Sequence, residues 1–142
     1  MVYKEIEEGR TCLRFEIPGA TVNYKRRKLF VSPTKYGEEF CPVVDISRGG
    51  LRFLSQRPLK IKSKVTLKIS VPGEKVPLSL KGRVKWAFAD SEKNYKYKIG
   101  VQFNPYGEKE GENYPGNMVK IIALEQKYAI KERAKTEKFE ID

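Results

Sequence analysis

The sequence predicts a mainly β protein, an antiparallel barrel or sandwich closed by one C-terminal helix. Between residues 12 and 104, short runs alternate apolar and polar residues, which is typical of strands with one face toward water. Segments such as VPGEKV and ADSEKN carry turn residues that would join the later runs as antiparallel neighbours. From about residue 117 the apolar residues recur at steps of three and four instead, which indicates an amphipathic helix.

The first four predicted strands are short or interrupted. LRFEIPGATVNY alternates loosely and is broken at Pro18-Gly19, and RKLFVS follows at residues 27–32. EEFCPVVDI then precedes GLRFLS, which places Leu51 and Phe53 on one face. The basic cluster Lys25-Arg26-Arg27-Lys28 is either a solvated turn or a contact for an acidic partner or nucleic acid.

The later strands alternate more strictly, and each run predicts one buried face. KVTLKISV places Val65, Leu67, Ile69 and Val71 on one side. VPLSLKGRVKWAF places on one side Leu78, Leu80, Gly82, Val84, Trp86 and Phe88. YKYKIGVQF places on one side Tyr95, Tyr97, Ile99, Val101 and Phe103.

A polar connector rich in Gly and Pro, NPYGEKEGENYPGN, separates the strands from the predicted helix. The helix is expected over about residues 117–136, with Asn117 as its N-cap. Its apolar face is predicted to carry Val119, Ile122, Ala123, Leu124, Ala129 and Ile130.

Composition narrows the function classes. The 142 residues fit one domain, and none of them is a histidine, so the usual general base and zinc ligand are missing. Cys12 and Cys41 have no metal-site spacing, and nothing pairs a nucleophile with a base, so we expect no enzyme. No run is apolar enough for a membrane span or signal peptide, so we expect a cytoplasmic protein. The net charge of +11 favours anionic partners.

The stretch VVDISRGGLRF, residues 43–53, has two interpretations. As structure alone, Asp45 and Ser47 before Gly49-Gly50 would form a capped Asx-turn. Alternatively, the carboxylate and hydroxyl could contact a ligand that approaches the backbone at the glycines. Arg48 would either reach a phosphate group or lie exposed to solvent.

Two arginines upstream of this stretch, Arg10 and Arg14, are four positions apart. They are either charged residues facing solvent or a clamp, because the guanidinium fork matches phosphate oxygens and the O6/N7 edge of guanine. Asp45 would complement such a clamp, since a carboxylate can accept hydrogen bonds from N1–H and the exocyclic amine of guanine. Asp45 follows Arg14 by 31 positions.

These residues resemble the paired motifs of PilZ domains, RxxxR and (D/N)xSxxG. GRVKW (82–86) and YKIGVQF (97–103) are similar to the later core strands of that family, and ALEQKYAIKERA is similar to the closing helix of YcgR-like flagellar brake proteins. The resemblance implies a non-enzymatic six-stranded antiparallel barrel with a C-terminal helix that binds cyclic di-GMP. It also implies a flexible arm, residues 1–14, before a barrel at 15–142.

By this resemblance Arg10, Arg14, Asp45, Ser47 and Gly50 would hold the messenger, which would sit between arm and barrel. Arg48, Gly49 and Trp86 are additional candidates; Trp86 is expected to pack in the core, with a face for stacking guanine as the alternative. The domain would relay ligand binding to a protein partner in motility, biofilm or exopolysaccharide control. A ligand-independent interaction barrel and, last, a nucleic-acid-binding barrel are the alternatives. No metal and no cofactor besides the ligand are expected.

Overall fold

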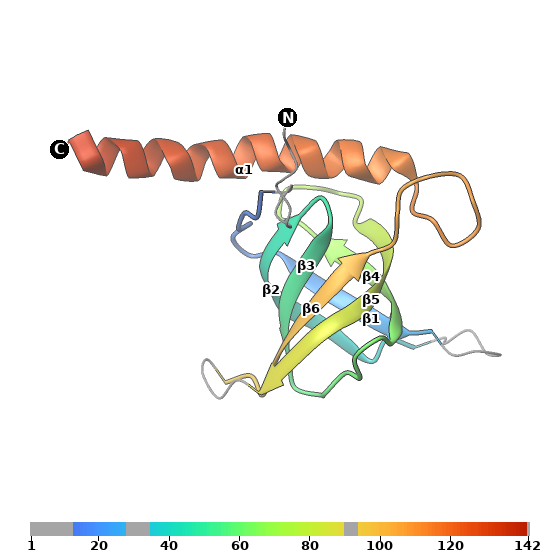
Figure 1. Ribbon diagram of the computed structural model, residues 1–142. Coiled ribbons are helices and arrows are strands. Elements are labelled where there is room, and N and C mark those ends of the chain that lie inside the picture. Colours follow the sequence, from blue (N-terminus) through green and yellow to red (C-terminus); the bar gives the residue numbers. More distant parts are fainter. Residues whose placement is uncertain (1–12, 28–34, 90–93, 142) are drawn as a thin grey trace.

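The computed structural model describes residues 13–27, 35–89 and 94–141. Within them, six strands form a closed antiparallel barrel in the order β1-β2-β3-β6-β5-β4, and a long helix lies across one end of it (Figure 1). The elements are β1 (Thr21–Arg26), β2 (Glu38–Ser47), β3 (Gly50–Ser55), β4 (Lys64–Ser70), β5 (Leu78–Ala89), β6 (Tyr97–Phe103) and α1 (Pro115–Ile141). The predicted six-stranded barrel with a C-terminal helix is confirmed.

The core fills the barrel interior because the strands alternate as the sequence predicts. In β4, Val65, Leu67 and Ile69 are at most 1% exposed, whereas Thr66 and Lys68 between them are only partly buried. Barrel closure pairs β1 with β4 and leaves no long unpaired strand edge in the described sheet. The outward residues of the same strands are therefore available to build a surface site.

The first predicted strand is divided into two parts. A turn at Pro18-Gly19, where Gly19 has φ +80°, separates β1 from the preceding segment. That segment forms an isolated antiparallel bridge between Phe15 and Ile46 of β2. The predicted run RKLFVS lies almost entirely outside the described residues.

The expectation that Trp86 packs in the core is wrong. A bulge between Val84 and Trp86 shifts the register of β5 against β6, so Ala87 takes the inward position and packs against the core. Trp86 is half-buried on the outer side of the barrel, and Phe88 is 61% exposed. Because of this one extra residue, the side chains of Trp86 and Phe88 face outward, where strict alternation predicts that they face the core.

Helix α1 begins at Pro115, two residues before the predicted start, which suits proline because the first helical position needs no N–H partner. Asn117 is therefore not the N-cap; its side-chain amide donates to Ser79 O at 2.9 Å. The buried face carries Ile121 and Leu124, whereas Val119 is 67% exposed and Ala123 is exposed as well, so the predicted helix face was wrong for Val119 and Ala123. In the described part of the chain, no helix combines the length and apolar character needed to cross a bilayer.

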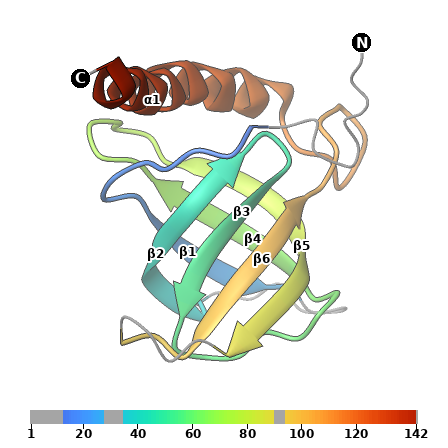
Figure 2. The same ribbon diagram turned by 60° about the vertical axis from the view of Figure 1, so that its left-hand side comes forward.

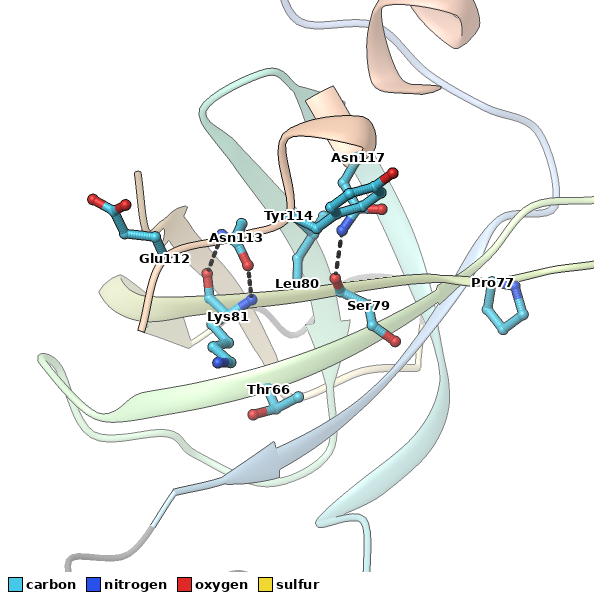
Figure 3. A pocket seen from close by; sticks show the side chains of 9 residues that line it. All are labelled: Thr66, Pro77, Ser79, Leu80, Lys81, Glu112, Asn113, Tyr114 and Asn117. Carbon is cyan, nitrogen blue, oxygen red and sulfur yellow. Dashed lines mark hydrogen bonds between the residues drawn. The ribbon is translucent and has the colours of Figure 1, made fainter. Parts of the chain in front are cut away.

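The side chain of Asn113 hydrogen-bonds to β5 at Lys81, where the pairing of β5 with β6 ends (Figure 3). Its Oδ1 accepts from Lys81 N at 2.7 Å, and its Nδ2 donates to Lys81 O and Asn104 O, both at 3.0 Å. The residue is 3% exposed. Its amide thereby supplies the acceptor for Lys81 N and a second donor to Lys81 O, which also accepts from Asn104 N at 2.9 Å, at the point where the pairing of β5 with β6 ends.

We expect Asn113→Ala to destabilise the barrel by about 1–3 kcal/mol, because it leaves the N–H of Lys81 without its acceptor, whereas Lys81 O keeps the hydrogen bond from Asn104 N. Urea unfolding followed by circular dichroism measures the change. The exposed helix position Gln126 provides the control, and Gln126→Ala should stay within about 0.5 kcal/mol of the wild-type protein. Equal stability of the two variants would contradict the assigned role of Asn113.

Candidate functional site

The β2–β3 hairpin presents the DISRGG turn at the end of the barrel covered by α1. Ile46 points into the core and is fully buried, so its neighbours Asp45 and Ser47 lie on the outer face of β2. Ser47 pairs with Gly50 across the turn, and Ser47 Oγ accepts from Gly49 N at 3.2 Å. Ser47 is 4% exposed, so the hydroxyl caps the turn in this structure.

Gly50 is required where β3 meets β6. A Cβ atom at this position would lie 2.5 Å from the carbonyl oxygen of Val101. The space beside its Cα is therefore occupied by the β6 backbone, which gives this glycine a structural reason. The neighbouring Gly49 is exposed, and its carbonyl accepts from Phe103 N at 2.9 Å.

The segment before the Pro18-Gly19 turn brings Arg14 to this hairpin. Phe15 N donates to Ile46 O, and Ile46 N donates to Phe15 O, both at 3.0 Å. Figure 2 shows this segment, in blue, running beside the β2–β3 hairpin below α1. Arg14 Nη1 lies 3.2 Å from Asp45 Oδ1, so two motif residues 31 positions apart meet at one carboxylate.

Arg52 contacts the same carboxylate and was missed in the sequence. Its Nε donates to Asp45 Oδ1 at 2.7 Å, and its Nη2 donates to Asp45 Oδ2. These hydrogen bonds raise the pKa of the Arg52 guanidinium above its ordinary value, against the opposing effect of partial burial. The Asp45 side chain is only 9% exposed, so this carboxylate is buried between two guanidinium groups. The feature that identifies Arg52 as a partner is the register of the β2–β3 hairpin, which pairs Asp45 with Arg52.

Arg48 joins the turn to α1. Its Nε and Nη2 donate to the two carboxylate oxygens of Glu125 at 3.1 and 3.2 Å, and the Glu125 side chain is 15% exposed. The hydroxyl of Tyr106 donates to Arg48 O at 2.7 Å. The Arg48 side chain stays 41% exposed in this fork-to-fork ion pair, and its contact with a phosphate group remains a prediction.

Trp86 belongs to a row of residues that crosses the outer face of the barrel. Arg52 pairs with Gly100, and Gly100 pairs with Trp86, so the row runs over β3, β6 and β5. The indole covers Gly100, where an added Cβ would lie 2.2 Å from the ring. The Trp86 and Phe88 rings lie 5.1 Å apart. The Cα atoms of Trp86 and Arg52 are thus two strands apart, about 10 Å by ordinary strand spacing, and the indole lies over the strand between them.

A separate polar cluster surrounds Glu38, at the end of β2 opposite the hairpin turn. Its Oε1 accepts from Tyr24 Oη and Arg57 N, and its Oε2 accepts from Gln56 N, all at 2.9 Å. Burial, reinforced by Glu38, raises the pKa of the Cys41 thiol to about 12, so the thiol stays protonated at neutral pH. Among the described residues, no group of three Cys, Asp or Glu side chains could hold a metal ion.

The structure thus gathers Arg14, Asp45 and Ser47 on one surface, next to the turn of Gly49 and Gly50. Arg48 is directed to α1, and Trp86 lies across β6 from Arg52. Arg10 lies outside the described residues. The arrangement offers guanidinium donors, one carboxylate and an aromatic face on the outside of a rigid barrel.

Comparisons with known proteins agree with this fold. The PilZ domain family model matches residues 21–114. The Bacillus subtilis inhibitor of motility (MotI/DgrA) has a similar structure, with a TM-score of 0.60 and 16% identity, over 89% of this chain and 52% of that one. This chain therefore spans about half the length of that protein. No curated protein matches it. PilZ domains are generally non-catalytic receptor modules. Since the PilZ family model matches well over half of the residues of this chain, the chain belongs to the PilZ domain family.

Proposed function

We propose that this chain is a receptor module for cyclic di-GMP that relays ligand binding to a protein partner. The observation that carries the proposal is the contact between Arg14 and Asp45, which brings one residue of each motif together. The proposed setting is the cytoplasm, in the control of motility, biofilm formation or exopolysaccharide production. The family membership and the likeness to a motility inhibitor support this setting.

The chemistry of the site suits a guanine nucleotide. Arg14 is 38% exposed and can turn to a phosphate or to the O6/N7 edge of guanine. Asp45 supplies the acceptor for N1–H and the exocyclic amine, and Ser47 supplies a hydroxyl next to it. Arg10 joins this set by its motif position. The net charge of +11 attracts the dianionic ligand.

Ligand binding requires an exchange at Asp45. Its Oδ1 already accepts from both Arg14 and Arg52, and its Oδ2 accepts from Arg52. A carboxylate has about four acceptor positions, so a guanine edge needing both oxygens must displace a guanidinium. Arg14 makes the fewer contacts and is the more exposed, so we infer that Arg14 leaves Asp45 for the ligand. That exchange would move the arm and change the surface that a partner meets.

Trp86 extends the proposed site. Its partly exposed indole lies across Gly100 from Arg52, on the same outer face of the barrel. Stacking of a guanine on an aromatic ring contributes about 1–3 kcal/mol. This supports the stacking role that the sequence left as the alternative for Trp86.

Isothermal titration calorimetry with cyclic di-GMP tests the proposal. We expect binding at micromolar or lower concentration, with Arg14→Ala weakening it at least about tenfold because a charge-assisted contact is lost. Cyclic di-AMP, which lacks the guanine donors, is the matched ligand control and should bind much more weakly. The absence of heat at high micromolar cyclic di-GMP would exclude this function.

One observation favours a second candidate, a barrel that binds its partner without any ligand. The carboxylate of Asp45 is already satisfied by two guanidinium groups of its own chain, so the site is electrostatically complete as it stands. In that case partner binding would be insensitive both to cyclic di-GMP and to Arg14→Ala.

A further inference from the structure

Two hollows lie along the seam between the start of β5 and the first half of α1. The larger, of about 450 Å³, is bordered by Ser79 and Lys81 of β5 and by Asn117 of α1 (Figure 3). The smaller, of about 160 Å³, lies between Val76 and the helix residues Lys120, Ala123, Leu124 and Lys127. We call this surface the α1–β5 seam; it comprises residues 76–81 and the α1 face from Asn117 to Lys127.

The smaller hollow has an apolar floor and an exposed apolar rim. Val71, Leu78 and Leu124 form the floor and are 6%, 4% and 7% exposed. On the rim, Val76 is 68% exposed and Ala123 is also exposed. A cavity of about 150 Å³ is large enough to bind benzene, so this hollow has room for one aliphatic or aromatic side chain.

An exposed aromatic side chain also borders the larger hollow. Tyr114, just before α1, lines this hollow and is 68% exposed. The residues around the two hollows do not belong to the proposed nucleotide site, which lies at the β2–β3 hairpin and contacts α1 through Glu125. Clustered exposed apolar residues with a polar rim are characteristic of protein interaction surfaces.

The charge on the seam selects the kind of partner. Exposed lysines stand at both ends of the smaller hollow, Lys120 and Lys127 on α1, and Lys75 stands next to Val76. Of the described residues that line the smaller hollow, Glu74 alone carries a carboxylate. A surface with an apolar floor between ammonium groups complements an apolar side chain flanked by carboxylates.

We propose that the α1–β5 seam docks an acidic segment of a partner protein, which inserts an apolar side chain between Val76 and Leu124. Carboxylates on either side of that residue pair with Lys120 and Lys127. Val76 and Ala123 then become buried, and the apolar contact supplies the affinity while the lysines orient the segment. The docking does not depend on cyclic di-GMP binding at the hairpin.

Nuclear magnetic resonance titration of the isotopically labelled full chain tests this proposal. The probe is a synthetic peptide of glutamates with leucines at every third or fourth position; one control peptide has serine for leucine, and another has lysine for glutamate. We expect saturable shifts at Val76, Ala123 and Leu124 with the first peptide alone, weakened by added salt. Equal shifts with the serine peptide, shifts located elsewhere, or none with any peptide would overturn the proposal.

Matched variants make the test specific. Ala123→Glu adds bulk and negative charge at the exposed rim and should weaken peptide binding at least about tenfold. Gln126→Glu makes a similar charge change at an exposed helix position outside the hollow and should stay within about twofold. Equal loss in both variants would contradict a defined groove. Shifts that grow with protein concentration without peptide would assign the seam to a second copy of this chain and overturn the acidic partner.

Discussion

Replacing Asp45 by asparagine is expected to lower the affinity for cyclic di-GMP by roughly 100-fold or more while the barrel stays folded. Asparagine keeps the shape but replaces one acceptor oxygen by an amide donor, which opposes the amine of guanine. The variant also removes the charge that holds Arg14 at the hairpin. Calorimetric titration measures the affinity, and circular dichroism measures the folded state.

The cost in stability should be small, about 1–2 kcal/mol, because the two partners of Asp45 can be solvated. The side chains of Arg14 and Arg52 are 38% and 31% exposed, so neither guanidinium is left buried without a partner. Urea unfolding of Asp45→Asn separates this cost from the loss of binding. A variant that is unfolded at room temperature would contradict the surface placement of the site.

Arg52→Gln is the matched control. It removes the guanidinium that makes two hydrogen bonds to Asp45, but it leaves the carboxylate, the proposed guanine acceptor, in place. Its affinity should stay within about tenfold of the wild-type value, because the ligand can take the acceptor positions that Arg52 vacates. If both variants lost affinity equally, Asp45 would act only as a support for Arg52.

The barrel could be predicted because its strands have one wet face, and the resulting alternation is visible in β4 and in the first half of β5. The errors have local physical causes. The bulge before Trp86 inserts one residue into β5, and no turn residue in the sequence marks it. The helix phase was misread because Val119 adds an apolar residue that the fold leaves exposed, while the buried position two residues later is Ile121.

The candidate site was predicted where it depends on motif residues and was missed where it depends on distant pairing. Asp45 and Arg52 face each other only through the register of the β2–β3 hairpin. Arg48 and Glu125 are 77 positions apart, so no periodicity relates them. Ion pairs of this kind follow from the docking of α1 onto the hairpin, which a single sequence does not encode in any short pattern.

Gly50→Ala is expected to destabilise the protein by about 3 kcal/mol, or roughly 5–12 °C in Tm. The new Cβ would lie 2.5 Å from the carbonyl oxygen of Val101, and a backbone atom cannot turn aside as a side chain can. Relief of this overlap requires β3 and β6 to separate next to the turn, where Phe103 N donates to Gly49 O at 2.9 Å. Thermal unfolding measured by circular dichroism gives the change.

The same variant separates the two roles of the motif glycine. Gln102 is the exposed β6 partner of Gly50, so Gln102→Ala removes only solvated atoms beside the same contact and should leave Tm nearly unchanged. If Gly50 serves strand approach, Gly50→Ala lowers Tm, and its affinity for cyclic di-GMP falls only as far as the hairpin is displaced. Full wild-type Tm combined with complete loss of binding would instead mean that the glycine leaves room for the ligand, and that the Val101 carbonyl can move away at little cost.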